Sequence, residues 1–290
     1  MKVVWIIGAI AFMLPLNMLG QVPDTAWQTE ASGRISFSQV GFYRWHDGGI
    51  NSLSLSTGVT AEASHRSRSV GQSHAMRLAY GVVKQNDLDL RKAEDLIHWR
   101  TEIELLRDSY VGSFHPILTV DIRSQFARGF KYDAKDEQPP MVISDFLSPA
   151  TLLQSLGVDH KPAPWVTLQA GFASKQTMVL NEDLRDRYRV NSSSLLRAEV
   201  GMSGLIQIDA EPFTNIHLTH SLSLFAAFKA AQKPDFVSET LITMRVNGWL
   251  QINAEYTAQM DRDVSRAVQM KEVVSLGLTF NLMPRRSDAG

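Results

Sequence analysis

The chain has 290 residues, with 29 Lys and Arg against 30 Asp and Glu, so its formal net charge is −1 at pH 7. This balance argues against a nucleic-acid-binding protein, which normally carries a basic excess. The lack of cysteine excludes disulfides, thiolate metal sites and a cysteine nucleophile, and a mean hydropathy of −0.11 excludes a bundle of membrane helices.

The N-terminus has the pattern of a secretory signal peptide. Lys2 is followed by an apolar run over residues 3–14. A charged start, a short apolar core and a small residue before a polar segment are typical of such a peptide. The run is too short for a membrane anchor, which needs roughly 20 apolar residues. We expect residues 1–20 to be removed near Gly20–Gln21, and residues 21–32 to form a short periplasmic segment.

Apolar and polar residues alternate along most of the remaining chain. Residues 274–282 show the pattern well, with Val, Leu, Leu, Phe and Leu at even positions and Ser, Gly, Thr and Asn between them. Successive side chains on a strand point to opposite faces, so each such segment has one apolar and one polar face. The pattern predicts strands at residues 33–43, 50–63, 73–84, 95–107, 114–127, 146–159, 165–179, 195–210, 216–229, 236–246, 249–260 and 272–282.

Alternation alone fits either a soluble β-sandwich or a transmembrane β-barrel. Most predicted strands exceed the roughly 5–6 residues usual in soluble sheets and reach the about 9–11 residues of a tilted membrane strand. Their connections are alternately long, up to residues 128–145, and short, down to Asn247-Gly248, which is a type I′ hairpin signal. Outer-membrane barrels have long loops at one rim and short periplasmic turns at the other. We therefore predict an all-β fold, an antiparallel transmembrane β-barrel of about 12 strands over residues 33–282, with a periplasmic tail at residues 283–290.

A series of short motifs also indicates a family. The motifs are Phe37-Ser38-Gln39 with Trp45-x-x-Gly48-Gly49-x-Asn51-Ser52, Arg91-Lys92-x-x-Asp95, Gln125-Phe126-x-x-Gly129-Phe130, Ile143-Ser144-x-Phe146-Leu147-Ser148-Pro149, Leu156-Gly157-Val158-Asp159-x-Lys161-Pro162 and Lys271-Glu272-Val273. In this order and spacing the chain resembles the domain of unknown function 3078 family, outer-membrane β-barrels of Gram-negative bacteria, over roughly residues 27–282. One departure is Arg44, where the family commonly has Asn. The resemblance implies the barrel and an outer-membrane location, and it brings no activity or catalytic residue.

The polar face of the predicted strands would line the lumen and carry a candidate charge network. Its members are Arg77, Arg100, Glu102, Glu104, Asp121, Arg123, Arg197, Glu199, Asp209, Glu239, Arg245 and Glu255. With Glu62 and Asp159, the inner face then has five basic and nine acidic residues. Side chains would leave a lumen of roughly 10 Å or less. Three interpretations remain open: paired charges fill the lumen, a narrow water-filled channel favours cations, or residues 26–32 or an outer loop partly plug the lumen.

The loops give a second set of candidate residues. Trp45, Gly48, Gly49 and Asn51 form a motif at the first hairpin tip, where glycines permit positive φ and a tryptophan suits the lipid interface. The longer loops carry balanced charge, which fits either a solvated surface or a contact with a partner or with lipopolysaccharide phosphates.

No catalytic motif is recognisable in the chain. It has no G-x-S-x-G elbow, H-E-x-x-H pair or Walker loop, and His220 falls on an apolar face, where Ser238 or Ser124 could accompany it. We expect no catalytic, cofactor or metal site and no enzyme activity. The favoured function is a structural or accessory outer-membrane protein that docks partners or lipid through its loops and outer wall. Expected partners are outer-membrane lipid, lipopolysaccharide or another outer-membrane protein, but not nucleic acid. The alternatives are a narrow, cation-leaning small-solute channel and, more distantly, a lipid-acting enzyme.

Overall fold

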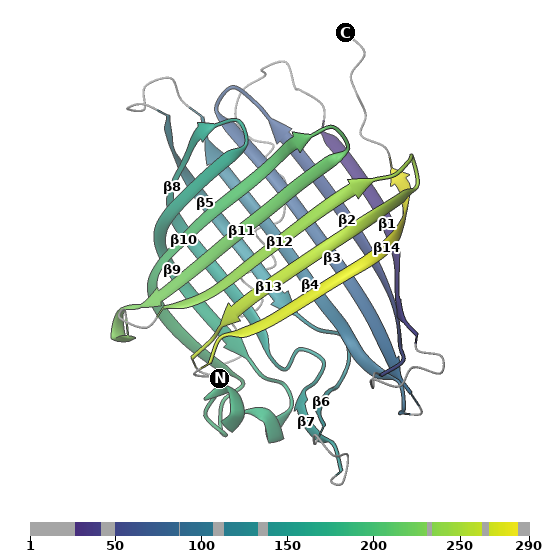
Figure 1. Cartoon of the computed structure of the whole chain (residues 1–290). Helices are drawn as coiled ribbons and strands as arrows, with labels where there is room; N and C mark the ends of the chain where they lie inside the picture. The colour runs from purple at the N-terminus through teal and green to yellow at the C-terminus, as the bar shows by residue number, and fades with distance from the viewer. Residues whose placement is uncertain are drawn as a thin grey trace.

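The computed structural model describes residues 27–41, 50–86, 88–106, 113–132, 139–230, 234–262 and 267–283. Within these ranges most of the chain is strand (Figure 1). The barrel strands are β1 (Gln28–Val40), β2 (Ser52–Arg66), β3 (Val70–Gln85), β4 (Arg91–Leu105), β5 (Phe114–Ser124), β8 (Ala150–Ala163), β9 (Val166–Met178), β10 (Leu196–Phe213), β11 (Ile216–Ala227), β12 (Asp235–Arg245), β13 (Leu250–Met260) and β14 (Gln269–Met283).

These twelve strands form one closed antiparallel barrel, which confirms the predicted fold. Neighbours in the barrel are neighbours in the chain, apart from the insertion of β6 and β7 between β5 and β8, and β1 pairs with β14 to close the ring. Closure leaves no unpaired sheet edge, so the ladder satisfies the backbone groups that would otherwise face lipid.

The largest difference from the predicted strand bounds is at the N-terminus, and the predicted strands at 95–107 and 146–159 also begin four residues away from β4 and β8. β1 begins at Gln28, so part of the segment predicted as residues 21–32 belongs to the barrel wall. The pairing of Gln28 with Ser64 and of Glu30 with Glu62 extends the ladder here, although small and polar residues hide the alternation. The predicted signal peptide (residues 1–20) lies outside the described residues, as does all but the first residue of the predicted tail at 283–290.

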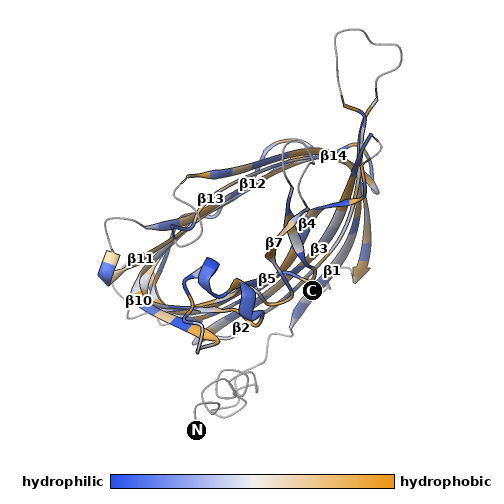
Figure 2. Ribbon diagram, turned by 90° about the horizontal axis from the view of Figure 1, so that it is seen from below, coloured by the Kyte–Doolittle hydropathy of each residue, from blue (hydrophilic) through white to orange (hydrophobic). Residues whose placement is uncertain are grey.

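The strands alternate their side chains between the outer and the inner face of the barrel wall. Leu55, Phe172 and Val200 face outward and are 51%, 68% and 63% exposed, whereas Ser36 and Asn253 face the lumen and are 4% and 0% exposed. Figure 2 shows the same alternation of apolar and polar residues along each strand. An apolar exterior around a polar interior is the arrangement of a transmembrane barrel.

The connections are longer on average at one end than at the other, as predicted, although 86–90 at the long-loop end is shorter than 106–113 at the short-turn end. The long-loop end, at the bottom of Figure 1, carries residues 41–51, 86–90, 125–149, 179–195, 228–234 and 261–268. The short-turn end carries residues 67–69, 106–113, 164–165, 214–215 and 246–249. The predicted type I′ turn at Asn247-Gly248 is wrong, because neither residue has a positive φ. Instead, the Asn247 side chain accepts hydrogen bonds from the backbone N–H groups of Trp249 and Leu250.

The two longest connections fold into a cap, defined here as the described parts of residues 125–149 and 179–195. The cap contains the hairpin of β6 (Gly129–Lys131) and β7 (Met141–Ser144) and the 3-10 turns η2 (Glu182–Leu184) and η3 (Asp186–Tyr188). Seen from the long-loop end, η2, η3 and β7 lie over the ring of strands (Figure 2). A third turn, η4 (Phe228–Ala230), follows β11. No helix among the described residues is long and apolar enough to cross a bilayer.

Candidate lumen charge network

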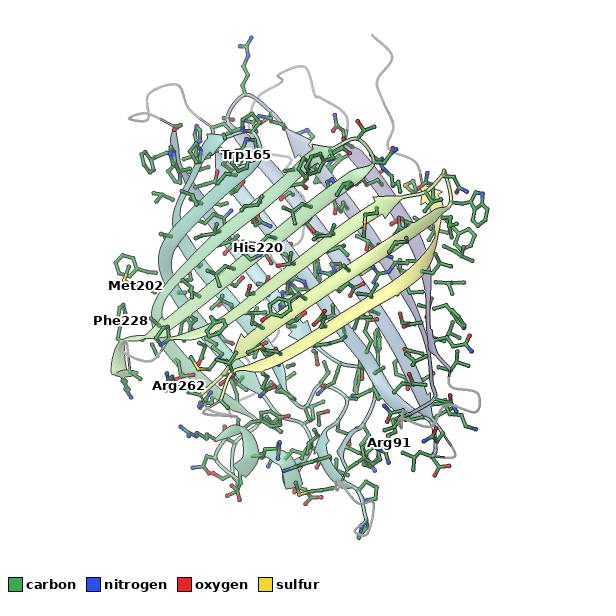
Figure 3. All side chains as sticks on the ribbon, in the orientation of Figure 1. Arg91, Trp165, Met202, His220, Phe228 and Arg262 are labelled. Atoms are coloured by element: carbon green, nitrogen blue, oxygen red, sulfur yellow. The ribbon has the colours of Figure 1, made fainter. Side chains whose placement is uncertain are left out.

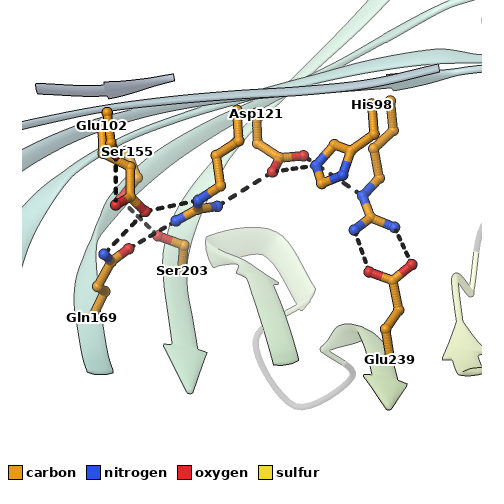
Figure 4. Close-up of polar contacts among 10 residues, drawn as sticks. His98, Glu102, Asp121, Ser155, Gln169, Ser203 and Glu239 are labelled. Atoms are coloured by element: carbon orange, nitrogen blue, oxygen red, sulfur yellow. Dashed lines mark hydrogen bonds and ion pairs between the residues drawn. The ribbon is translucent and has the colours of Figure 1, made fainter. Parts of the chain in front are cut away.

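Asp121 is the centre of a network of charged side chains inside the barrel, here called the central network (Figure 4). Its carboxylate lies 2.9 Å from His98 Nε2, 3.3 Å from Arg100 Nη1 and 3.7 Å from Arg123 Nε. The three groups come from β4 and β5, whose register places His98 opposite Arg123 and Arg100 opposite Asp121. One carboxylate is thus surrounded by three groups that can carry positive charge.

Arg123 extends the network across the lumen. Its guanidinium donates two hydrogen bonds to Glu239, Nη2 to Oε2 at 2.6 Å and Nη1 to Oε1 at 3.2 Å. Arg123 lies on β5 and Glu239 on β12, and four strands separate the two along the shorter way around the barrel. A bidentate Arg–carboxylate pair is strong and geometrically specific, so it fixes the distance between two walls that share no backbone hydrogen bonds.

A second arm of the network runs toward the short-turn end. Arg100 Nε lies 2.8 Å from Glu102 Oε1, and Arg100 Nη2 donates to Gln169 Oε1 at 2.8 Å. The Gln169 amide donates to Glu102 at 3.2 Å and to Asp159 at 3.0 Å. Lys161 then bridges Asp159 and Glu104 at 3.2 and 3.4 Å. Buried charges are tolerated when they are paired in this way.

Cavities lie on either side of the central network. On the long-loop side, a cavity of about 540 Å³ lies against Arg100, Asp121 and Arg123. Toward the short-turn end, two cavities of about 470 and 300 Å³ share Glu102 in their linings. Arg100 lines both the long-loop cavity and the smaller of these two. The guanidinium and its partners therefore lie between the two ends of the lumen.

The other predicted network residues lie on the inner wall but outside the central network. Glu255 pairs with Arg34 at 2.9 Å, and Arg197 pairs with Glu199 on its own strand at 3.2 Å. Near the short-turn end, Arg245 pairs with Glu211 at 2.8 Å and Asp209 with His217 at 3.4 Å. Arg77 lies opposite His98 in the β3–β4 register. The predicted set thus forms one connected group and several separate pairs.

Several members of the inner wall lie outside the predicted network. Arg34, His98, Gln169 and Lys175 were not among the predicted network residues, although all lie on the inner face. Lys175 reaches Asp235 at 2.7 Å and Asp261 at 3.3 Å. The alternation that predicts the inner face was present for Gln169 and Lys175, which lie at the odd positions of β9, between its outward-facing residues. It was weak because Gly171 and Ala173 occupy the polar face between them.

The loop motif lies mostly outside the described residues. This applies to Trp45, Gly48 and Gly49, whereas Asn51 precedes β2. The backbone N–H of Asn51 donates to Asn86 Oδ1 at 3.1 Å, and its carbonyl accepts from Asn86 N at 2.9 Å. Asn51 therefore joins two neighbouring loops at the long-loop end.

Three of the family motifs meet at the base of the cap. Asp95 accepts hydrogen bonds from the backbone N–H groups of Phe126 and Ala127 at 2.7 and 2.9 Å. Lys92 Nζ donates to Asp95 and to the Ala127 carbonyl, both at 2.8 Å. Gly129 packs so closely on Ser144 Oγ that a Cβ would overlap it. These motifs therefore fix where the longest loop leaves the barrel.

Asp145 joins the two halves of the cap. Its carboxylate accepts hydrogen bonds from Phe146 N at 2.9 Å, Asn181 Nδ2 at 3.0 Å and Arg128 Nε at 3.2 Å. The Phe146 N–H bond, together with Asn181 and Arg128, lowers the pKa of Asp145 below its ordinary value. Asp145 is therefore held in its charged form by the contacts that build the cap.

The cap has a small hydrophobic core of its own. Val179, Leu184, Tyr188 and Val190 are buried together, and Val142 of β7 packs against them. Tyr188 Oη donates to the Ile143 carbonyl at 2.7 Å, and burial raises the pKa of this phenol. The cap is thus an ordered substructure of the long-loop end.

The histidine considered for lipid chemistry faces the outside of the barrel. His220 lies at mid-height on the outer wall (Figure 3), with its Nδ1 2.9 Å from Thr240 Oγ1. Ser238 is also on the outer wall, opposite Leu222 in the β11–β12 register, and Ser124 lies on β5. His220 is thus hydrogen-bonded to a threonine.

The family model described as "Protein of unknown function (DUF3078)" matches residues 37–130. Over that segment it confirms the family resemblance predicted from the motifs. The segment covers the motifs up to Gln125–Phe130, and those from Ile143 onward lie beyond it. Among curated proteins no relative matches the chain.

Several solved structures are similar to the barrel. The translocator domain of autotransporter NalP from Neisseria meningitidis is 10% identical, with coverage of 94% of this chain and 92% of that one and a TM-score of 0.35. The COG4313 outer membrane channel from Pseudomonas putida F1 is 10% identical, with coverage of 90% and 98% and a TM-score of 0.40. Salmonella typhi OmpF in complex with daunomycin is 8% identical, with coverage of 89% and 97% and a TM-score of 0.31. At these sequence identities and TM-scores, the similarity is no evidence that this chain shares an activity with those proteins.

Proposed function

We propose that this chain is an outer-membrane β-barrel with a closed lumen and a structural or accessory role, without catalytic chemistry of its own. The observation that carries the proposal is the bidentate Arg123–Glu239 pair, which joins opposite parts of the wall. A conducting pore needs a continuous water-filled path, and this pair with the rest of the central network occupies the middle of the lumen.

The outer wall supports the proposed location. Large apolar side chains cover it, and the loops are long at one end and short at the other, as in outer-membrane barrels. By this comparison the long-loop end faces the outside of the cell and the short-turn end faces the periplasm. Outer-membrane lipid is then the first partner of the outer wall.

The cap is the proposed docking element. Phe130, Met141 and Phe146 are apolar cap residues that are 38%, 51% and 51% exposed. Exposed apolar side chains on an ordered element suit contact with a protein or with lipid. Lys131 and Arg128 lie in the same loop and could contact phosphate groups of lipopolysaccharide.

A narrow small-solute channel is the second candidate function. It is favoured by the cavities on both sides of the central network. Glu30, Glu62 and Asp209 line the space toward the short-turn end and would favour cations. Conduction would require the Arg123–Glu239 pair to separate.

Conductance in planar lipid bilayers tests the two candidates. We expect the purified protein to show no steady current, because the paired charges of the central network occupy the middle of the lumen. A steady, cation-selective current from the unaltered protein would overturn the closed-lumen proposal and favour the channel. Gentle detergent extraction with affinity purification tests the docking role, and a partner that is lost on removal of the cap residues 179–195 is the expected result.

A further inference from the structure

The long-loop cavity of about 540 Å³ has a more apolar lining than the two cavities toward the short-turn end. Leu96, Leu153, Phe225 and Val237 point inward from β4, β8, β11 and β12 and all line it. Tyr188 of the cap lines the same space. On the inner wall of a water-filled barrel these positions would be polar, so their gathering at one place needs another explanation.

The charges at the inner end of this cavity, and Lys175 on its wall, are already paired with one another, while Arg187 of the cap also lines it. Arg123 is held by Glu239 and Asp121, and Arg100 by Asp121 and Glu102. Lys175 is held between Asp235 and Asp261, with its ammonium 5.8 Å from the centre of the Phe225 ring. An anionic ligand would have to break these pairs, whereas an uncharged one would leave them intact.

We propose that this cavity is a binding site for a small, uncharged apolar or aromatic molecule. Its volume falls within the roughly 300–1,000 Å³ of ligand pockets, which are lined by apolar and aromatic side chains with a few polar groups. Gln125 and the hydrogen-bonded pair of Gln259 and Gln269 supply the polar groups. Gln125 Nε2 already donates to the Asp145 and Ser148 carbonyls, so its Oε1 is the atom left to accept from a hydroxyl. The central network closes the inner end, so the molecule is held there from the long-loop side.

The chain has no cysteine, so one introduced thiol reports on one place. Val237→Cys puts a thiol in the cavity, two residues from Glu239 toward the long-loop end. Leu241→Cys is the matched control: it faces the lumen from the same strand, two residues from Glu239 on the other side, and does not line the cavity. The measurement is the labelling rate with N-phenylmaleimide in proteoliposomes, with and without benzyl alcohol.

Benzyl alcohol at roughly twice its dissociation constant should slow labelling of the Val237→Cys variant about threefold, by simple occupancy, and leave the Leu241→Cys variant unchanged. When Leu153→Trp is added to the Val237→Cys variant, the larger side chain fills the cavity. Benzyl alcohol should then no longer slow the labelling. Glycerol should protect neither thiol. Heat-modifiable migration on a gel shows that each variant is folded, and Leu153→Cys replaces Val237→Cys if that variant does not fold.

Three results would overturn the proposal. Benzyl alcohol could slow both variants equally, which indicates a general effect of the alcohol on the bilayer. It could fail to slow the Val237→Cys variant at all. Finally, the Val237→Cys thiol could react only after unfolding, which means that the cavity admits no molecule of this size.

Discussion

Arg123 links two carboxylates on different sides of the lumen: Asp121, beside it on β5, and Glu239, across the lumen on β12. The side chains of Arg123 and Glu239 are 26% and 21% exposed, so both are largely removed from water. Removing one partner from such a pair leaves an uncompensated charge, which costs more than the pair itself contributes.

We therefore expect Arg123→Ala to lower the free energy of unfolding by about 2–3 kcal/mol and to allow a bilayer current. Glu239→Gln keeps hydrogen-bonding groups at the site and should cost less, about 1–2 kcal/mol. The double variant should cost less than the sum of the two, because the second change removes a charge that the first left unpaired. Urea unfolding in lipid vesicles measures these differences.

Arg245→Ala is the control for this series. Its pair with Glu211 is 51% and 58% exposed, so its loss should change stability by less than about 1 kcal/mol. If Arg123→Ala proves as mild as Arg245→Ala and passes no current, the central network does not hold the walls together.

Gly129 shows how a single missing Cβ shapes the cap. A Cβ built there would overlap Ser144 Oγ and lie 3.2 Å from Lys92 Nζ. Gly129→Ala should therefore loosen the base of the cap, and we expect loop 125–149 to be cleaved by trypsin at least several-fold faster while the barrel remains heat-modifiable. Gly248→Ala is the matched control, since a Cβ there meets nothing within 4 Å. Equal cleavage of the two variants would contradict this role of Gly129.

At the scale of elements, the cap depends on a few polar contacts around a small apolar core. Asp145 joins the described parts of loops 125–149 and 179–195 through Asn181, while Ser148 accepts from Asn181 N at 2.9 Å. Such an element opens more easily than the barrel wall, because local unfolding needs only its own contacts to break.

The lowered pKa of Asp145 predicts how the cap responds to pH. A carboxyl with a lowered pKa in the folded state contributes stability that is present above its ordinary pKa of about 3.9 and is lost as the pH falls through the lowered value. Hydrogen-exchange protection of residues 179–195, corrected for intrinsic rates, should therefore fall in this acidic range. Strands β10–β12 serve as the internal reference. In Asp145→Asn the protection should be weaker at neutral pH and nearly independent of pH. A wild-type cap whose protection does not change down to about pH 2 would contradict the prediction.

The barrel strands could be predicted from sequence because each is long enough to show several cycles of the two-residue period. β14 does so over Val274–Leu282, with the even positions outward. The cap could not be predicted in this way. β6 has 3 residues and β7 has 4, and η2 and η3 have 3 each, so no period develops within them. Their order comes from side-chain contacts such as those of Asp145 and Tyr188.

At the scale of the whole molecule, the alternation of apolar and polar residues predicts which face of the barrel wall a residue occupies, but not which residue it contacts across the lumen. Alternation places both Arg123 and Glu239 on the inner wall, yet the two residues are 116 positions apart in the chain. Their contact depends on the closure of the ring and on how the strands are staggered, and neither is encoded within one strand. The central network, and the apolar cavity beside it, are consequences of closure that single segments do not show.

The register also predicts how the whole barrel responds to charge on its two walls. Leu222 lies on the outer wall near the middle of β11, opposite Ser238, while its neighbour Ser221 faces the lumen opposite Glu239. An arginine facing the bilayer midplane costs about 2–4 kcal/mol, whereas substitutions facing the lumen are tolerated. We therefore expect Leu222→Arg to lower the free energy of unfolding in lipid vesicles by this amount. Ser221→Arg should change it little, because the new guanidinium enters the lumen beside a carboxylate. Urea unfolding of both variants measures the contrast between two adjacent residues. A mild effect of Leu222→Arg would mean that the apolar wall does not face lipid, since an arginine exposed to water on a soluble barrel carries no such cost.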